Sequence, residues 1–223
     1  MSAIVAALAA LGGGLGALAW EPLEPWLIAR SKGADELLEQ PAWTRTVTSR
    51  PMLVLASALA CGAAGWRFGA TQELIPALVL AFGLVGISAI DLRYRIIPDR
   101  ISLPLAVAGL VLAAALRPSD LPELLLAAFG AGGFLLIAAL LSPGGMGIGD
   151  VKLAFVLGLF LGRSVVIAVV LGLVGPAVPM LLLLPRYGLR ARKLHLALGP
   201  FLALGGMVAL LFGDDLISWY TGG

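Results

Sequence analysis

The sequence predicts an all-α membrane protein that crosses the bilayer about eight times, with both termini outside. Of its 223 residues, 60% are hydrophobic and only 13% are charged, and the mean hydropathy is +1.02. A water-soluble domain usually carries charged groups at about a quarter of its positions. Apolar runs long enough to span a membrane as helices also recur along the whole chain. These observations exclude a soluble fold, and the net charge of +2 gives no basis for nucleic-acid binding.

Eight apolar runs define the predicted spans. A spanning helix needs roughly 20 mostly apolar residues, and all runs approach this length except a short sixth one. The sixth and seventh runs meet at Gly162 and Arg163 and could be one broken element, so six or seven spans are also possible. The runs cover residues 2–20, 51–67, 73–92, 101–116, 122–141, 152–162, 164–184 and 197–213.

The distribution of basic residues orients these spans. With the first residue outside, twelve of the 15 Lys and Arg residues fall in cytoplasmic segments, as the positive-inside rule requires. No Lys or Arg precedes the first run, so we expect a retained helix rather than a cleavable signal peptide. The three basic residues left outside are Arg67, Arg117 and Arg163.

We expect a single membrane domain, residues 1–223, with a cytoplasmic loop at 21–50 and a helical core at 51–213. The glycines at 12 and 16 form a small-xxx-small pair that would let the first helix pack closely on a neighbour. The lone cysteine, Cys61, excludes an internal disulfide and a cysteine-cluster zinc site.

Two acidic residues near the membrane boundary are the best candidates for chemistry. Asp91 closes the third apolar run and Asp150 opens the sixth, 59 positions later. The end of an odd-numbered span and the start of an even-numbered span meet the same face, so both acids are predicted at the cytoplasmic boundary. Burying a carboxylate near lipid costs several kcal/mol by most estimates, which favours a function for this pair.

Paired carboxylates suit peptide hydrolysis by the aspartic route. One ionised carboxylate takes a proton from the attacking water, while its protonated partner donates to the carbonyl oxygen. Each acid also has a simpler interpretation. Asp150 could be only a helix cap, and Asp91 could form a surface ion pair with Arg93 or Arg95. The segment 142–149 contains Pro143 and four glycines, so it cannot be a continuous helix; such a break belongs against protein or a wet cavity.

Three motifs resemble those of one family. Gly147-x-Gly149-Asp150, followed by Lys152, resembles the GxGD signature of intramembrane aspartic proteases. The segment from Asp91 to Ile97-Pro98-Asp99 is similar to the first-aspartate segment of prepilin peptidases, the type IV leader peptidases. The stretch 198–205, which contains Gly-Pro-Phe, resembles a third motif of that family. The resemblance covers roughly residues 51–206, which makes 51–213 the expected peptidase core.

This resemblance implies an aspartic endopeptidase of the bacterial inner membrane, with its active site facing the cytoplasm. Its expected substrates are type IV prepilin or pseudopilin precursors, whose leader peptide it would remove for a pilus or a protein secretion system. Asp91 and Asp150 match the family's catalytic aspartates. Gly147, Gly149, Lys152, Pro98 and Asp99 are expected to bind substrate or support the site.

No metal or cofactor is expected to be required for proteolysis. Long bacterial members carry paired CxxC motifs in the first cytoplasmic loop, but loop 21–50 contains no cysteine. The absence of these metal ligands argues against the N-methyltransferase activity of such members and their use of S-adenosylmethionine.

Other interpretations remain open from sequence alone. Asp99 follows Pro98 at a helix start, where a cap is the commoner role than tuning of the aspartates. Lys152 could contact substrate, although extension toward the interface is the commoner fate of such a side chain. A small proton-coupled transporter could use the same acids, as could a different GxGD-type membrane protease.

Overall fold

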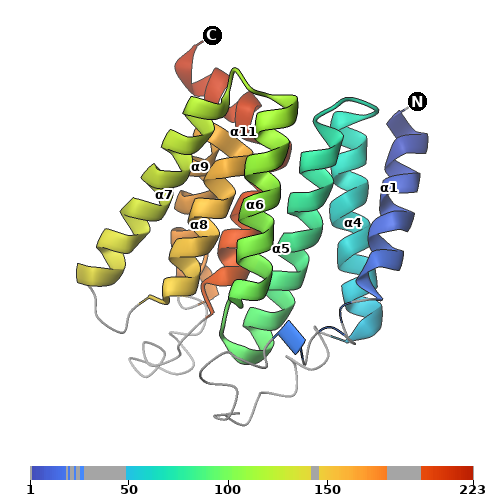
Figure 1. Ribbon diagram of the computed structural model, residues 1–223. Coiled ribbons are helices and arrows are strands. Elements are labelled where there is room, and N and C mark those ends of the chain that lie inside the picture. The colour runs from blue at the N-terminus through green and yellow to red at the C-terminus, as the bar shows by residue number, and fades with distance from the viewer. Residues whose placement is uncertain are drawn as a thin grey trace.

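The computed structural model describes residues 2–18, 20, 23, 26–27, 49–141, 146–179 and 197–222. Every regular element within these residues is a helix, as the sequence predicts (Figure 1). Most of the predicted loop 21–50, the glycine-rich residues 142–145 and residues 180–196 lie outside the described part of the chain. The elements are α1 (Ser2–Ala17), α4 (Arg50–Phe68), α5 (Leu74–Tyr94), α6 (Asp99–Leu116), α7 (Leu121–Leu141), α8 (Ile148–Leu161), the 3₁₀ turn η1 (Gly162–Ser164), α9 (Val165–Val174) and α11 (Gly199–Thr221).

The described helices follow the eight predicted apolar runs. Six helical stretches are long and apolar enough to span a membrane, with residues 148–179 counted as one stretch and the shorter α1 left out. Inside that stretch the chain reverses direction at Gly162, whose φ of +55° suits glycine. Ser164 then bonds to Asp214 near the end of α11, whereas Gly172 packs against Leu202 near its start. The sixth and seventh runs are therefore two antiparallel helices, and the chain is a multi-pass membrane protein.

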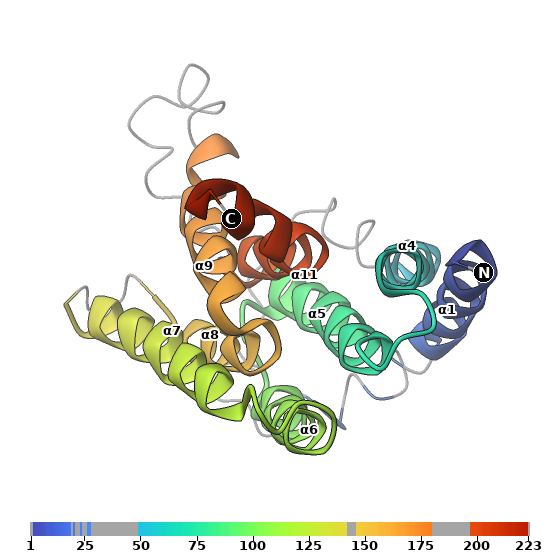
Figure 2. The same cartoon turned by 90° about the horizontal axis from the view of Figure 1, so that it is seen from above.

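The helices that carry the candidate acids form the interior of the bundle. In α5, 61% of the apolar window is buried, and in the stretch containing α8 and α9 the share is 67%. The other four candidate spans are only 22–33% buried. Figure 2 shows the same arrangement from one end, with α5 and α8 between the α1–α4 pair on one side and α6 and α7 on the other. Fully buried side chains of this interior include Leu80, Leu84, Ile87, Leu153, Leu157 and Leu202.

The outer helices expose large apolar side chains where a soluble protein would carry polar ones. Leu126, Phe129 and Leu141 on α7 are 75%, 67% and 79% exposed. A row of such side chains on the outside of a bundle is stable only against lipid. The exposed surface thus agrees with the membrane location inferred from composition.

The bundle has two distinct ends. The end of α5 and the starts of α6, α8 and α11 lie together at one end, here called the aspartate end because Asp91, Asp99 and Asp150 lie there. The start of α1 and the end of α11 lie at the opposite end (Figure 1). Arg67, Arg117 and Arg163, the three basic residues predicted outside, also lie on helix ends or turns at this opposite end.

Two details differ from the sequence prediction. The last helix continues to Thr221 instead of ending at 213, because Asp214 and Asp215 bond to Ser164 and Arg67 and need not leave the helix. The first helix does not pack through the glycine at 12, whose Cβ position has no neighbour within 4 Å, and the glycine at 16 faces Phe82 of α5. Its close contact with α4 is made one residue later, where Gly13 lies against Cys61.

Candidate active site

Asp91 is held in the interior by the start of another helix. It lies in the last turn of α5 and is only 5% exposed. The backbone N–H of Gly199, the first residue of α11, donates to Asp91 Oδ2 over 3.0 Å. A helix start offers unpaired N–H groups and the positive end of the helix dipole, both of which favour a carboxylate. A carboxylate at a surface ion pair would be more exposed than this, although Arg95 lies near enough to Asp91 to act on it electrostatically.

Position 199 accommodates only glycine beside this carboxylate. A Cβ atom there would lie 2.5 Å from Asp91 Oδ2 and 3.0 Å from its Cγ. Gly199 is not among the site residues that the sequence predicts. Its one signal in the sequence was the Gly-Pro-Phe stretch, which gives no spatial relation to Asp91.

Asp150 is held in a similar way at the start of its own helix. It occupies the third position of α8, and its Oδ2 accepts the N–H of Gly147, the N-cap residue, over 3.1 Å. This contact is the acidic half of a capping box, so the capping interpretation of Asp150 is correct as far as it goes. The side chain is nevertheless only 8% exposed. A residue that serves only as a helix cap does not need to be buried in the bundle interior.

The fold brings these two carboxyl groups together. Asp150 is close enough to Asp91 to act on it electrostatically, and so is Arg95. Each aspartate uses Oδ2 for one backbone N–H, and within the described residues neither Oδ1 has a hydrogen-bond partner. One oxygen of each acid is thus held by a backbone N–H group.

A tight connection follows Asp91 and reaches α8. Arg95 ends α5 in the left-handed region, at φ 54°, and its N–H donates to the carbonyl of Asp91. A left-handed non-glycine residue costs roughly 1–2 kcal/mol, which marks a constrained turn. The chain then places Ile97 against Gly149, where a Cβ would lie 2.9 Å from Ile97 Cβ. The glycine next to Asp150 therefore admits a side chain of the protein itself.

Pro98, Asp99 and Lys152 extend this contact. Pro98 is the N-cap residue of α6, and Asp99 follows it in the first turn without making a side-chain cap. The expectation that Asp99 acts as a cap is therefore wrong, because the helix begins at the carbonyl of Pro98. Instead, Lys152 Nζ lies 2.5 Å from Asp99 Oδ1. Lys152 is paired rather than extended freely toward the interface.

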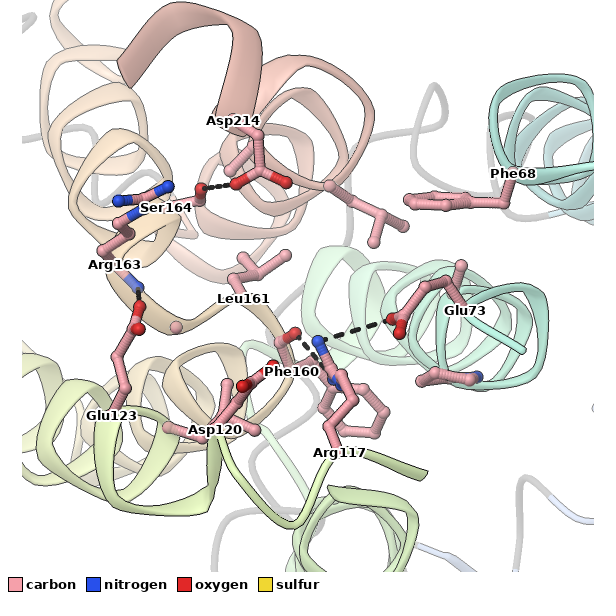
Figure 3. A pocket seen from close by; sticks show the side chains of 16 residues that line it. Phe68, Glu73, Arg117, Asp120, Glu123, Phe160, Leu161, Arg163, Ser164 and Asp214 are labelled. Atoms are coloured by element: carbon pink, nitrogen blue, oxygen red, sulfur yellow. Dashed lines mark hydrogen bonds and ion pairs between the residues drawn. The ribbon is translucent and has the colours of Figure 1, made fainter. Parts of the chain in front are cut away.

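A second polar cluster lies at the opposite end of the bundle (Figure 3). Its cavity, of about 400 Å³, contains none of the site residues predicted from the sequence. Arg117 lies 3.5 Å from Glu73 and donates to the carbonyl of Phe160, while Ser164 donates to Asp214. These contacts tie together the ends of α5, α6, α8 and α11, and they support the bundle away from the aspartates.

The known proteins that this chain resembles belong to one family of leader peptidases. Residues 78–184 match the Type IV leader peptidase family. A prepilin leader peptidase/N-methyltransferase of Xanthomonas campestris is 33% identical over 90% of this chain and 70% of its own length. A protein of the same name from Stutzerimonas stutzeri is 32% identical over 91% and 70%. One from Bacillus subtilis is 35% identical over 76% and 68%. No solved structure matches significantly.

The chain belongs to the type IV leader peptidase family, as its motifs predicted. It is a peptidase embedded in the membrane by several helices, and the interpretation as a proton-coupled transporter is set aside. The matched segment, 78–184, includes both aspartates and the Asp99–Lys152 pair.

Proposed function

We propose that the protein is an intramembrane aspartic endopeptidase that removes the leader peptide from type IV prepilin-like or pseudopilin precursors. The observation that carries this proposal is the pairing of Asp91 and Asp150, which come from separate helices and are each fixed through a single oxygen. In the bacterial inner membrane, the positive-inside rule would direct their end of the bundle toward the cytoplasm.

The pair can supply both the acid and the base of the reaction. Two carboxyl groups in mutual electrostatic contact share one proton, since the second negative charge is opposed by the first. The ionised member removes a proton from water as the oxygen attacks the carbonyl carbon of the scissile bond. The protonated member donates to the carbonyl oxygen, which gives a tetrahedral diol. The carboxyl group that took the water proton then protonates the amide nitrogen, while the other carboxylate takes a proton from the diol. The C–N bond breaks, and the amine and the new carboxylic acid are released. The backbone N–H groups of Gly147 and Gly199 hold each carboxylate while its other oxygen reacts.

Neither step requires a metal or S-adenosylmethionine. Water and the two carboxyl groups supply every proton transfer, and loop 21–50 lacks the cysteines of a zinc site. The relatives' names include an N-methyltransferase activity; for this chain we propose proteolysis alone.

The test is cleavage of a synthetic prepilin by protein reconstituted in liposomes. We expect Asp91→Asn and Asp150→Asn each to reduce the rate at least about 10³-fold, because each removes a proton-transfer group. Both variants should retain the wild-type thermal unfolding temperature in detergent. Cleavage should continue in EDTA and without S-adenosylmethionine.

The matched control is Asp120→Asn. Asp120 is an exposed aspartate at the opposite end of the bundle, where it accepts from Ser119. This variant should cleave at the wild-type rate. Normal cleavage by either Asp91→Asn or Asp150→Asn would end the proposal.

A further inference from the structure

The ion pair between Asp99 and Lys152 joins the two chain segments that carry the aspartates. Asp99 begins α6, eight residues after Asp91, and Lys152 lies in the first turns of α8, two residues after Asp150. The distance from Lys152 Nζ to Asp99 Oδ1 is 2.5 Å. The pair is thus a direct polar bridge between the two halves of the site.

We propose that this ion pair is a positioning contact that sets the spacing of Asp91 and Asp150 for catalysis, an inference that rests on the proposed function. The segment after Asp91 contacts α8 at two points. Ile97 lies against Gly149 on one side of Asp150, and Asp99 pairs with Lys152 on the other. Farther along, α6 packs on α8 where Gly109 meets the ring of Phe160, well away from the aspartates. The ion pair therefore adds a polar contact between the two segments at the level of the aspartates.

The pair is suited to geometry more than to stability. The side chains of Lys152 and Asp99 are 39% and 56% exposed, and ion pairs this exposed add little to folding free energy. Catalysis is far more sensitive to position, since a displacement of about 1 Å can reduce a rate about 10²-fold. Loss of the pair should therefore lower kcat while leaving the unfolding temperature almost unchanged.

Reversing the charges separates this role from direct contact between Lys152 and the substrate. In Asp99→Lys and in Lys152→Asp the two side chains repel each other, so we expect kcat to fall about tenfold or more while KM stays within about twofold. The double variant restores an ion pair with the charges exchanged. We expect its kcat to return to within about threefold of wild type, since coupled residues show non-additive effects.

A comparable ion pair at the opposite end of the bundle serves as the control. Arg67 Nη2 lies 3.1 Å from Asp215, and these side chains are 36% and 66% exposed. Asp215→Asn should leave kcat unchanged, whereas the equivalent Asp99→Asn should lower it. The neutral variants Asp99→Asn and Lys152→Met also provide the test if a charge-reversed protein fails to fold, and Lys152→Arg should retain activity.

Two results would overturn the proposal. A double variant as impaired as Lys152→Asp alone would show that Lys152 acts on the substrate itself. Unchanged kcat in Asp99→Asn and Lys152→Met would show that the pair positions nothing. In either case, if Asp91→Asn remains inactive, only the positioning role fails; if Asp91→Asn cleaves normally, the proposed function fails as well.

Discussion

At the scale of single residues, the site is built on three glycines as much as on two acids. Gly147 and Gly199 each donate a backbone N–H to one aspartate, and Gly149 admits Ile97 beside Asp150. The acids could be predicted from the sequence because burying a carboxylate near lipid costs free energy, which favours a function for it. Gly199 could not, because its proximity to Asp91 arises from packing between α5 and α11, 108 residues apart in the chain.

The role of Gly199 can be tested by adding one methyl group. Gly199→Ala would place a Cβ only 2.5 Å from Asp91 Oδ2, so the carboxylate must move away from its N–H donor. We expect kcat to fall about 10²-fold, measured by prepilin cleavage in liposomes. Gly133→Ala, on α7 with open space around its Cβ position, is the control and should cleave normally. Full activity of Gly199→Ala would show that the N–H of Gly199 does not position Asp91.

At the scale of elements, helix packing depends on small residues at particular positions. The α7–α8 contact is closest at Gly158, where a Cβ would lie 2.3 Å from the Cα of Ala128. The sequence predicted close packing through glycine in general. It assigned the packing contact of the first helix to the glycines at 12 and 16, whereas Gly13 makes the contact with α4. Every face of such a helix is apolar, so hydrophobic periodicity does not reveal which face meets protein and which meets lipid.

The α7–α8 contact gives a prediction about stability. Gly158→Ala should force the two helices apart and destabilise the protein by roughly 1–3 kcal/mol, the usual cost of overpacking. Thermal unfolding in detergent measures this as a lower transition temperature. Gly130→Ala, whose Cβ position on α7 is open, should be neutral or slightly stabilising, because alanine favours the helix. An unchanged transition temperature in Gly158→Ala would contradict the close packing.

At the scale of the whole molecule, the apolar runs predicted the helices and their alternating direction, while the membrane orientation that the basic residues indicate stays a prediction. Asp91 ends the third apolar run and Asp150 begins the sixth. Because successive spans alternate in direction, counting the spans was enough to predict that both acids lie at the same end. The inner position of α5 and of the α8–α9 stretch did not follow from the sequence, because apolar composition is similar in buried and lipid-facing helices. The reversal of the chain at Gly162 could not be predicted either, because a short polar break can bend a helix or end it.

Membrane orientation can be tested with single cysteines in a Cys61→Ser background. Ser119→Cys at the opposite end should react with a membrane-impermeant maleimide in intact cells. Ser49→Cys, at the start of α4 and at the aspartate end, should react only after permeabilisation. This pattern follows from the positive-inside rule. The reverse pattern would place the aspartates outside and remove the proposed access to a cytoplasmic leader peptide.

The joint action of Asp91 and Asp150 is tested most directly by the binding of a prepilin peptide whose scissile amide is replaced by a hydroxyethylene group. This group imitates the tetrahedral intermediate, which both carboxylates would contact, and analogues of this kind bind about 10²-fold or more tightly than substrate. The account predicts such tight inhibition of the wild-type protein and its loss in Asp91→Asn and in Asp150→Asn alike. Equal affinity of the wild type and either variant for the analogue would contradict it.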